Sequence, residues 1–249
     1  MKLGIIQSRG LGDIIIALPI AHHYHRLGWE VHWCVTDSWV AQLRHHARWC
    51  TWHAVKDDGH LFYYDLPQAI LKDVGVDEVI CLYNSLTGHP EFGAEPYFQH
   101  VSFDRYKYLR AGVSFEEKWQ LKDCIVRDLQ RETLLKQSLE IKEPYVITHL
   151  TSSEQTVRLP PDLIPPEYRV IPITTQGWIF DWLTVIEQAE ALIMTDSVFA
   201  NLVDQLKIPV EKYFIPQHHI QLTPQHVMHW QWLPNPDLKK QAVIFQPQP

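Results

Sequence analysis

Apolar and polar residues alternate along the first half of the chain in a strand–helix rhythm. Short apolar runs bounded by polar turns predict buried strands, and longer stretches with apolar residues at helical spacing predict amphipathic helices. We expect strands at 2–7, 30–35 and 78–82, and helices from Asp13 to about Arg26 and from Asp37 onward. Strands that alternate with helices favour a parallel sheet with helices on its faces.

The same rhythm restarts in the second half of the chain. Residues 84–117 are less regular, and Pro144 ends a helix expected at 129–139. Beyond it we expect strands at 145–150, 168–173 and 191–194, and helices at 179–189 and 198–206. The Pro-, Gln- and His-rich stretch 216–249 is expected to lie over the surface. The sequence therefore predicts two α/β domains, 1–141 and 142–249.

Composition excludes several classes of protein. The 249 residues carry a net charge of −7, which gives no global basic field for coating nucleic acid, although a local basic groove is compatible with it. The longest uncharged apolar run, 14–21, is too short to span a bilayer, and no signal-peptide pattern opens the sequence, so we expect a cytoplasmic protein. Four cysteines without a Cys-x-x-Cys pair predict buried, reduced thiols.

Candidate chemistry lies at the ends of the predicted strands. With only 10 glycines, the chain has neither a Gly-x-Gly-x-x-Gly fingerprint nor a Walker A sequence. Ligands of open α/β sheets bind at the carboxyl ends of the strands. Two facing halves would therefore place a cleft between 8–13 on one side and 151–153 with 196–197 on the other.

The first candidate motif is Ser8-Arg9-Gly10-Leu11-Gly12-Asp13. Gly10 and Gly12, at a strand-to-helix turn, allow the backbone to approach a ligand closely. Asp13 suits two roles equally well, a helix N-cap or a catalytic base at the mouth of a cleft.

Two further motifs lie in the second half. Hydroxyls at Ser152 and Ser153, followed by Arg158, offer donors and a positive charge to a diphosphate, although an ordinary polar loop would have the same composition. A helix that begins at Ser197, after Asp196, would direct free N–H groups at a departing diphosphate, or Asp196 and Ser197 would simply cap a core helix.

Ser-x-x-Gly-Asp followed by Leu-Pro-x-Ala resembles the amino-terminal motif of glycosyltransferase family 9, the ADP-heptose lipopolysaccharide heptosyltransferase-like proteins. The resemblance implies a GT-B fold, which is two Rossmann-like domains with the active site between them, and an inverting, metal-independent reaction. It also implies that Asp13 is the general base. Arg158 stands at the position of the family's Lys.

The third motif is similar to the family's Asp-Thr-Gly-x-x-His-Leu. Asp196, Ser197 and Leu202 match that pattern, whereas Val198 replaces the Gly and Asn201 replaces the His. We assign Ser152, Ser153, Arg158, Asp196, Ser197 and Asn201 to the donor diphosphate. Arg9, Gly10 and Gly12 are assigned to the acceptor-side loop.

These observations predict an inverting glycosyltransferase with a nucleotide-sugar as co-substrate and no cofactor or metal. A saccharide acceptor is favoured, and a hydroxymethylated DNA base is a second class. A non-catalytic nucleotide- or sugar-binding module is the alternative. The 15 histidines form no His-Glu-x-x-His pattern. Basic residues at Arg105, Lys107 and Arg110 are interpreted as a solvated helix face rather than an acceptor grip, and nucleobase recognition is expected near 173–180.

Overall fold

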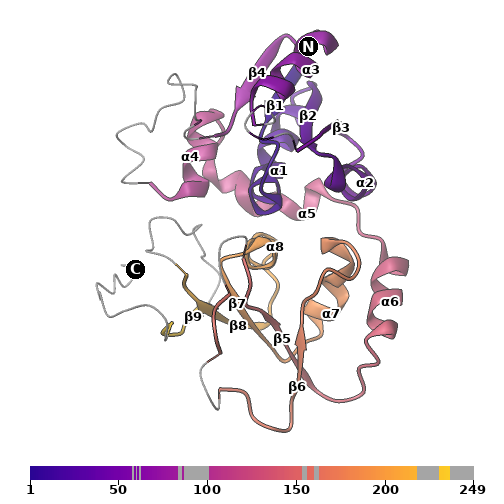
Figure 1. The fold of residues 1–249 in the computed structure, drawn as a ribbon, viewed down its shortest axis with the longest axis vertical. Coiled ribbons are helices and arrows are strands. Elements are labelled where there is room, and N and C mark those ends of the chain that lie inside the picture. Colours follow the sequence, from indigo (N-terminus) through magenta and orange to yellow (C-terminus); the bar gives the residue numbers. More distant parts are fainter. Residues whose placement is uncertain are drawn as a thin grey trace.

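The chain forms two lobes, one above the other, each built on its own sheet (Figure 1). The structure is a computed structural model, and it describes residues 1–57, 59, 61, 63–83, 86, 101–152, 156–159, 163–217 and 230–235. Both sheets are parallel throughout, which confirms the predicted α/β class. No helix in these residues is long and apolar enough to cross a membrane.

The first lobe is a four-stranded sheet in the order β3-β2-β1-β4. Its elements are β1 (Lys2–Ile6), α1 (Leu11–Arg26), β2 (Glu30–Thr36), α2 (Asp37–His46), β3 (Thr51–Val55), α3 (Asp65–Val74) and β4 (Glu78–Cys81). Helices α1 and α2 cover one face, and α3 covers the other. Gly4 lets α3 approach closely, because a Cβ there would lie 2.8 Å from Leu71 Cδ1. The sequence patterns missed β3 and α3.

A group of helices follows the first sheet. It consists of α4 (Phe103–Arg110), the 3-10 helix η3 (Phe115–Gln120), α5 (Leu121–Cys124) and α6 (Leu129–Ser138). Two contacts hold α4 in place. The Tyr108 hydroxyl donates to the Ile16 carbonyl of α1 at 2.8 Å, and Asp104 forms a fully buried ion pair with Lys118 of η3. Part of the stretch expected to be irregular is therefore regular helix.

The second lobe is a five-stranded sheet in the order β6-β5-β7-β8-β9. Its elements are β5 (Tyr145–His149), β6 (Arg169–Pro172), η4 (Ile179–Trp182), α7 (Leu183–Glu187), β7 (Ala191–Thr195), α8 (Val198–Gln205), β8 (Glu211–Ile215) and β9 (Trp230–Trp232). Helices α7 and α8 cover the face toward the first lobe. The opposite face packs against loop residues Val157, Leu163 and Ile164, and the described residues between β5 and β6 contain no helix.

Strand β9 corrects the expectation that 216–249 only lies over the surface. It pairs with β8, because Trp230 packs on the Phe214 ring with centroids 5.7 Å apart. The Trp230 indole also donates to Asp204 Oδ1 at 2.9 Å. Burying a large aromatic side chain with its N–H paired favours the added strand.

One apolar core runs through both lobes, and α1 packs directly against α8. Pro19 lies inside α1 and has no N–H, so the carbonyl of Ile15, four residues earlier, lacks its helical partner. The side-chain amide of Gln205, at the end of α8, donates to that carbonyl at 3.1 Å. A gap in the hydrogen bonding of one helix is thus filled from the other lobe.

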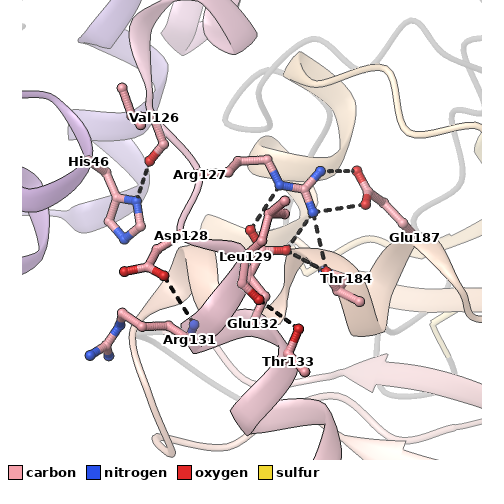
Figure 2. A network of polar contacts seen from close by, with 10 residues as sticks. All are labelled: His46, Val126, Arg127, Asp128, Leu129, Arg131, Glu132, Thr133, Thr184 and Glu187. Carbon is pink, nitrogen blue, oxygen red and sulfur yellow. Dashed lines mark hydrogen bonds and ion pairs between the residues drawn. The ribbon is translucent and has the colours of Figure 1, made fainter.

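The chain crosses between the lobes at 125–128, and both lobes hold this segment (Figure 2). On the first lobe, His46 Nδ1 donates to the Val126 carbonyl at 2.7 Å, and burial lowers the pKa of His46. On the second, Arg127 pairs with Glu132 and Glu187, while Glu132 also accepts from the Thr184 amide at 3.0 Å. Helix α6 lies beside α7 (Figure 1), and the expected boundary at 141/142 stays a prediction.

Candidate active site

Asp13 lies in the first turn of α1 but does not cap it. The N-cap residue is Gly10, with φ of +79°, and within the described residues no side chain caps this helix. A Cβ at Gly10 would overlap Asp13 Oδ2, so the carboxylate lies directly over the glycine. Asp13 therefore does not have the capping role that the sequence left open, and its role as a general base stays a prediction.

The carboxylate of Asp13 is paired with a buried lysine. Lys107 Nζ lies 3.0 Å from Asp13 Oδ1; the Asp13 side chain is 26% exposed and that of Lys107 only 3%. Lys107 belongs to α4, whose basic residues we interpreted as a solvated face, and for Lys107 this interpretation is wrong. Tyr106 and Tyr108, on either side of it in the sequence, are buried as well.

The acceptor-side loop lies against two tyrosines that the sequence patterns missed. The Arg9 guanidinium donates to the Tyr63 hydroxyl at 2.6 Å, and the Arg9 amide donates to the Tyr83 hydroxyl at 3.0 Å. Ser8 Oγ lies 3.1 Å from the same Tyr83 oxygen, and burial raises the pKa of Tyr83. These contacts fix the backbone of the turn that precedes Asp13, and the Arg9 side chain is exposed.

The second and third motifs meet at one edge of the second sheet, because β5 and β7 are adjacent. Ser152 follows β5 and is partly exposed, and Ser153 lies outside the described residues. Thr151 and Thr156 form a bridge, and Val157 donates its amide to the Leu150 carbonyl at 2.9 Å. This hairpin returns the chain along β5 and leaves Arg158 exposed at the carboxyl end of the sheet.

Ser197 is the N-cap of α8, with its hydroxyl accepting from the Ala200 amide at 3.3 Å. Ser197 therefore caps the helix, which is one of the two roles that the sequence left open for this motif. Asp196 beside it is partly exposed. Asn201 Nδ2 donates to the Ser197 carbonyl at 2.9 Å. Asn201 Oδ1 is buried and has no partner among the described residues, so one acceptor at this helix start is unsatisfied.

His149, at the end of β5, is a further residue that the sequence patterns missed. Its ring lies 4.9 Å from that of Phe199 on the first turn of α8, and its Nδ1 is buried without a partner in the described part of the chain. Burial lowers the pKa of His149 to about 4, so the ring is neutral at physiological pH. The Nδ1 atom of His149 is thus a second unsatisfied polar atom near the start of α8.

The two helix starts are in contact. A Cβ added at Gly12 would lie 3.5 Å from Val198 Cα and 3.6 Å from the Val198 amide nitrogen. Helix N-termini carry partial positive charge, and here two of them converge from different lobes. The start of α1, which carries Asp13, therefore lies against the start of α8 in the other lobe.

Metal and nucleobase assignments have less structural support. Among the described residues, no group of three His, Cys, Asp or Glu side chains is placed to hold a metal ion, and the absence of a metal stays a prediction. Within 173–180, Gln176 donates to Ser138 Oγ at 2.8 Å and the Trp178 ring lies 3.8 Å from the Arg131 guanidinium. Nucleobase binding there also stays a prediction.

No family model matches the sequence. No curated protein matches it either. Three solved structures are similar. The glycosyl transferase family 9 protein from Veillonella parvula has a TM-score of 0.60 at 9% identity, over 94% of this chain and 86% of that one. Escherichia coli ADP-heptose lipopolysaccharide heptosyltransferase II has a TM-score of 0.55 at 10% identity, over 94% and 90%.

The third is the E. coli heptosyltransferase WaaC with ADP, with a TM-score of 0.55 at 12% identity, over 95% of this chain and 94% of that one. At identities of 9–12%, these similarities show the fold alone. The chain therefore has the two-lobed GT-B fold of family 9 glycosyltransferases and ADP-heptose heptosyltransferases, as its motifs indicated.

Proposed function

We propose that this protein is an inverting glycosyltransferase that moves a sugar from a nucleotide-sugar donor to an acceptor hydroxyl. The observation that carries the proposal is the contact between the start of α1, which bears Asp13, and the start of α8, which bears Ser197 and Asn201. The similarity to WaaC, whose structure contains ADP, supports a nucleoside diphosphate as the leaving group.

The proposed reaction is a single displacement. Asp13 removes the proton from the acceptor hydroxyl as that oxygen forms a bond to the anomeric carbon. The bond between the anomeric carbon and the diphosphate oxygen breaks, and its electron pair leaves with the nucleoside diphosphate. Arg158 and the start of α8 stabilise the charge that develops on this group. Attack opposite the leaving group inverts the anomeric configuration.

The role of Asp13 is tested by Asp13→Asn. A general base contributes about 10²–10⁴-fold, so turnover should fall by that factor while donor affinity, measured by calorimetry, stays nearly constant. Asp37→Asn is the matched control, since Asp37 is an exposed residue in the first turn of α2 in the same lobe. Turnover of Asp13→Asn equal to that of the control would refute the assignment.

The acceptor is proposed to be a saccharide, with a hydroxymethylated DNA base as the second class. Labelled nucleotide-sugars, ADP-heptose among them, should be tested with glycan, protein and hydroxymethylated DNA acceptors. Transfer to glycan alone supports the first assignment, and transfer to DNA alone supports the second. Metal independence is part of the proposal, and it predicts unchanged transfer after exhaustive treatment with a chelator.

A non-catalytic nucleotide- or sugar-binding module is the second candidate. It is favoured by Val198 and Asn201, which stand where the family pattern has Gly and His, and by the packing of the Val198 backbone against Gly12. Tight binding of a nucleoside diphosphate, without transfer or hydrolysis on any acceptor in the panel, would establish this function instead.

A further inference from the structure

We infer that Lys107 is a positioning residue that fixes the carboxylate of Asp13 and leaves one defined oxygen available to the acceptor. The inference rests on the proposed function, and it adds a residue that none of the three sequence motifs contains. It starts from the ion pair between Lys107 and Asp13, which joins α4 to the start of α1.

The ammonium group of Lys107 donates hydrogen bonds to Gln7 Oε1 at 2.8 Å and to the Leu82 carbonyl at 3.4 Å. It also forms an ion pair with Asp13 Oδ1 at 3.0 Å. Gln7 is itself held, since its Nε2 donates to the Arg9 carbonyl at 2.8 Å. Two hydrogen bonds and an ion pair fix the position of this buried ammonium group.

The two oxygens of Asp13 therefore have different environments. Oδ1 is held by Lys107, toward the interior of the lobe. Oδ2 lies over Gly10, where a Cβ would overlap it. Because Oδ1 is engaged in the ion pair, the proton of the acceptor hydroxyl would be taken by Oδ2, while the ion pair between Lys107 and Oδ1 persists through the reaction.

Lys107 is 3% exposed, so a substrate cannot reach it and it acts only through Asp13. Without the ammonium group, Asp13 would rotate about its side-chain torsions, because Lys107 is the one partner that its carboxylate has among the described residues. Misplacing a catalytic group by 1 Å costs on the order of 10²-fold in rate. The loss should therefore appear in kcat rather than in donor binding.

The experiment compares Lys107→Met with Lys212→Met. Lys212 is also 3% exposed, but it lies on β8 and donates to the Ile208 carbonyl, remote from Asp13. Lys107→Met should lower kcat by about 10²-fold with KM and donor affinity nearly unchanged, and Lys212→Met should keep the wild-type kcat. Lys107→Arg is the second variant: it retains the charge, cannot place one nitrogen beside Gln7, Leu82 and Asp13 together, and should lower kcat as well.

A double variant separates this inference from the proposed function. In Asp13→Asn, adding Lys107→Met should change kcat no further, because residues that act as one unit are not additive. The inference would be overturned if Lys107→Met lowered kcat in the Asp13→Asn background as much as in the wild type. It would also be overturned if Lys107→Met alone kept the wild-type kcat. Wild-type turnover in Asp13→Asn would instead overturn the proposed base.

A crystal structure of the folded variant gives a readout that needs no activity. In Lys107→Met or Lys107→Arg, the Asp13 carboxylate should leave its position over Gly10. If it keeps the wild-type orientation, Lys107 does not position it, whatever reaction the protein catalyses.

Discussion

The hydrogen bond between Gln205 and Ile15 predicts a coupling across the lobes that a double-variant cycle can measure. Gln205→Leu removes the donor and leaves the Ile15 carbonyl buried without a partner, since Pro19 supplies no N–H. An unsatisfied buried backbone group costs about 1–3 kcal/mol. In Pro19→Ala, the new amide at position 19 donates to Ile15 within the helix, so the same Gln205→Leu change should cost far less.

The cycle is measured by urea unfolding of the wild type, the two single variants and the double variant. We expect a coupling free energy of about 1–3 kcal/mol, and a melting temperature for Gln205→Leu lower by about 2–4 °C for each kcal/mol lost. Removing Gln205 also removes its unpaired Oε1, but that gain is present in both backgrounds and cancels. Equal destabilisation by Gln205→Leu in the wild type and in the Pro19→Ala variant would refute the reasoning.

Two further predictions concern the candidate site. Gly10→Ala would displace Asp13 Oδ2 and strain a residue at φ +79°, so turnover should fall by about 10-fold or more with the donor affinity retained; a wild-type kcat would contradict the geometry. The pKa of His149 is lowered from 6.5 to about 4, so the unfolded state binds a proton that the folded state rejects, and stability present above pH 6.5 should be lost as the pH falls toward 4. In urea unfolding, the loss in the free energy of unfolding should reach about 3 kcal/mol at most, and it should be smaller in His149→Phe. A difference in stability between the two proteins that does not change with pH would contradict the prediction.

The fold class was predictable because its signals are local. Apolar runs at 2–7, 145–150 and 191–194 are long enough and sharply enough bounded by turns to indicate buried strands. Strand β3 was missed because Thr51–Val55 is short and has His53 in its middle, which breaks the apolar run, and because its pairing with β2 is not visible in the sequence. Strand β9 has only three residues and depends on Trp230 packing over Phe214, a contact between distant parts of the chain.

The candidate site was predictable only where a motif marks it. Asp13 and Ser197 lie at helix starts that the sequence patterns indicate. Lys107 and Gln7 could not be placed, because their roles arise from the folding of α4 and β4 against the end of β1. Nothing in a linear pattern says which of several basic residues on a helix turns inward, and long-range packing decided it.

The single apolar core that unites the lobes limits how such proteins can exchange parts. A chimaera that joins this first lobe to the second lobe of a relative would keep every residue of the amino-terminal motif. It would still lose the fit of α1 against α8, including the donor that Gln205 contributes to a helix on the other side. Recombination at this junction should therefore succeed only when the facing surfaces of both helices are inherited together.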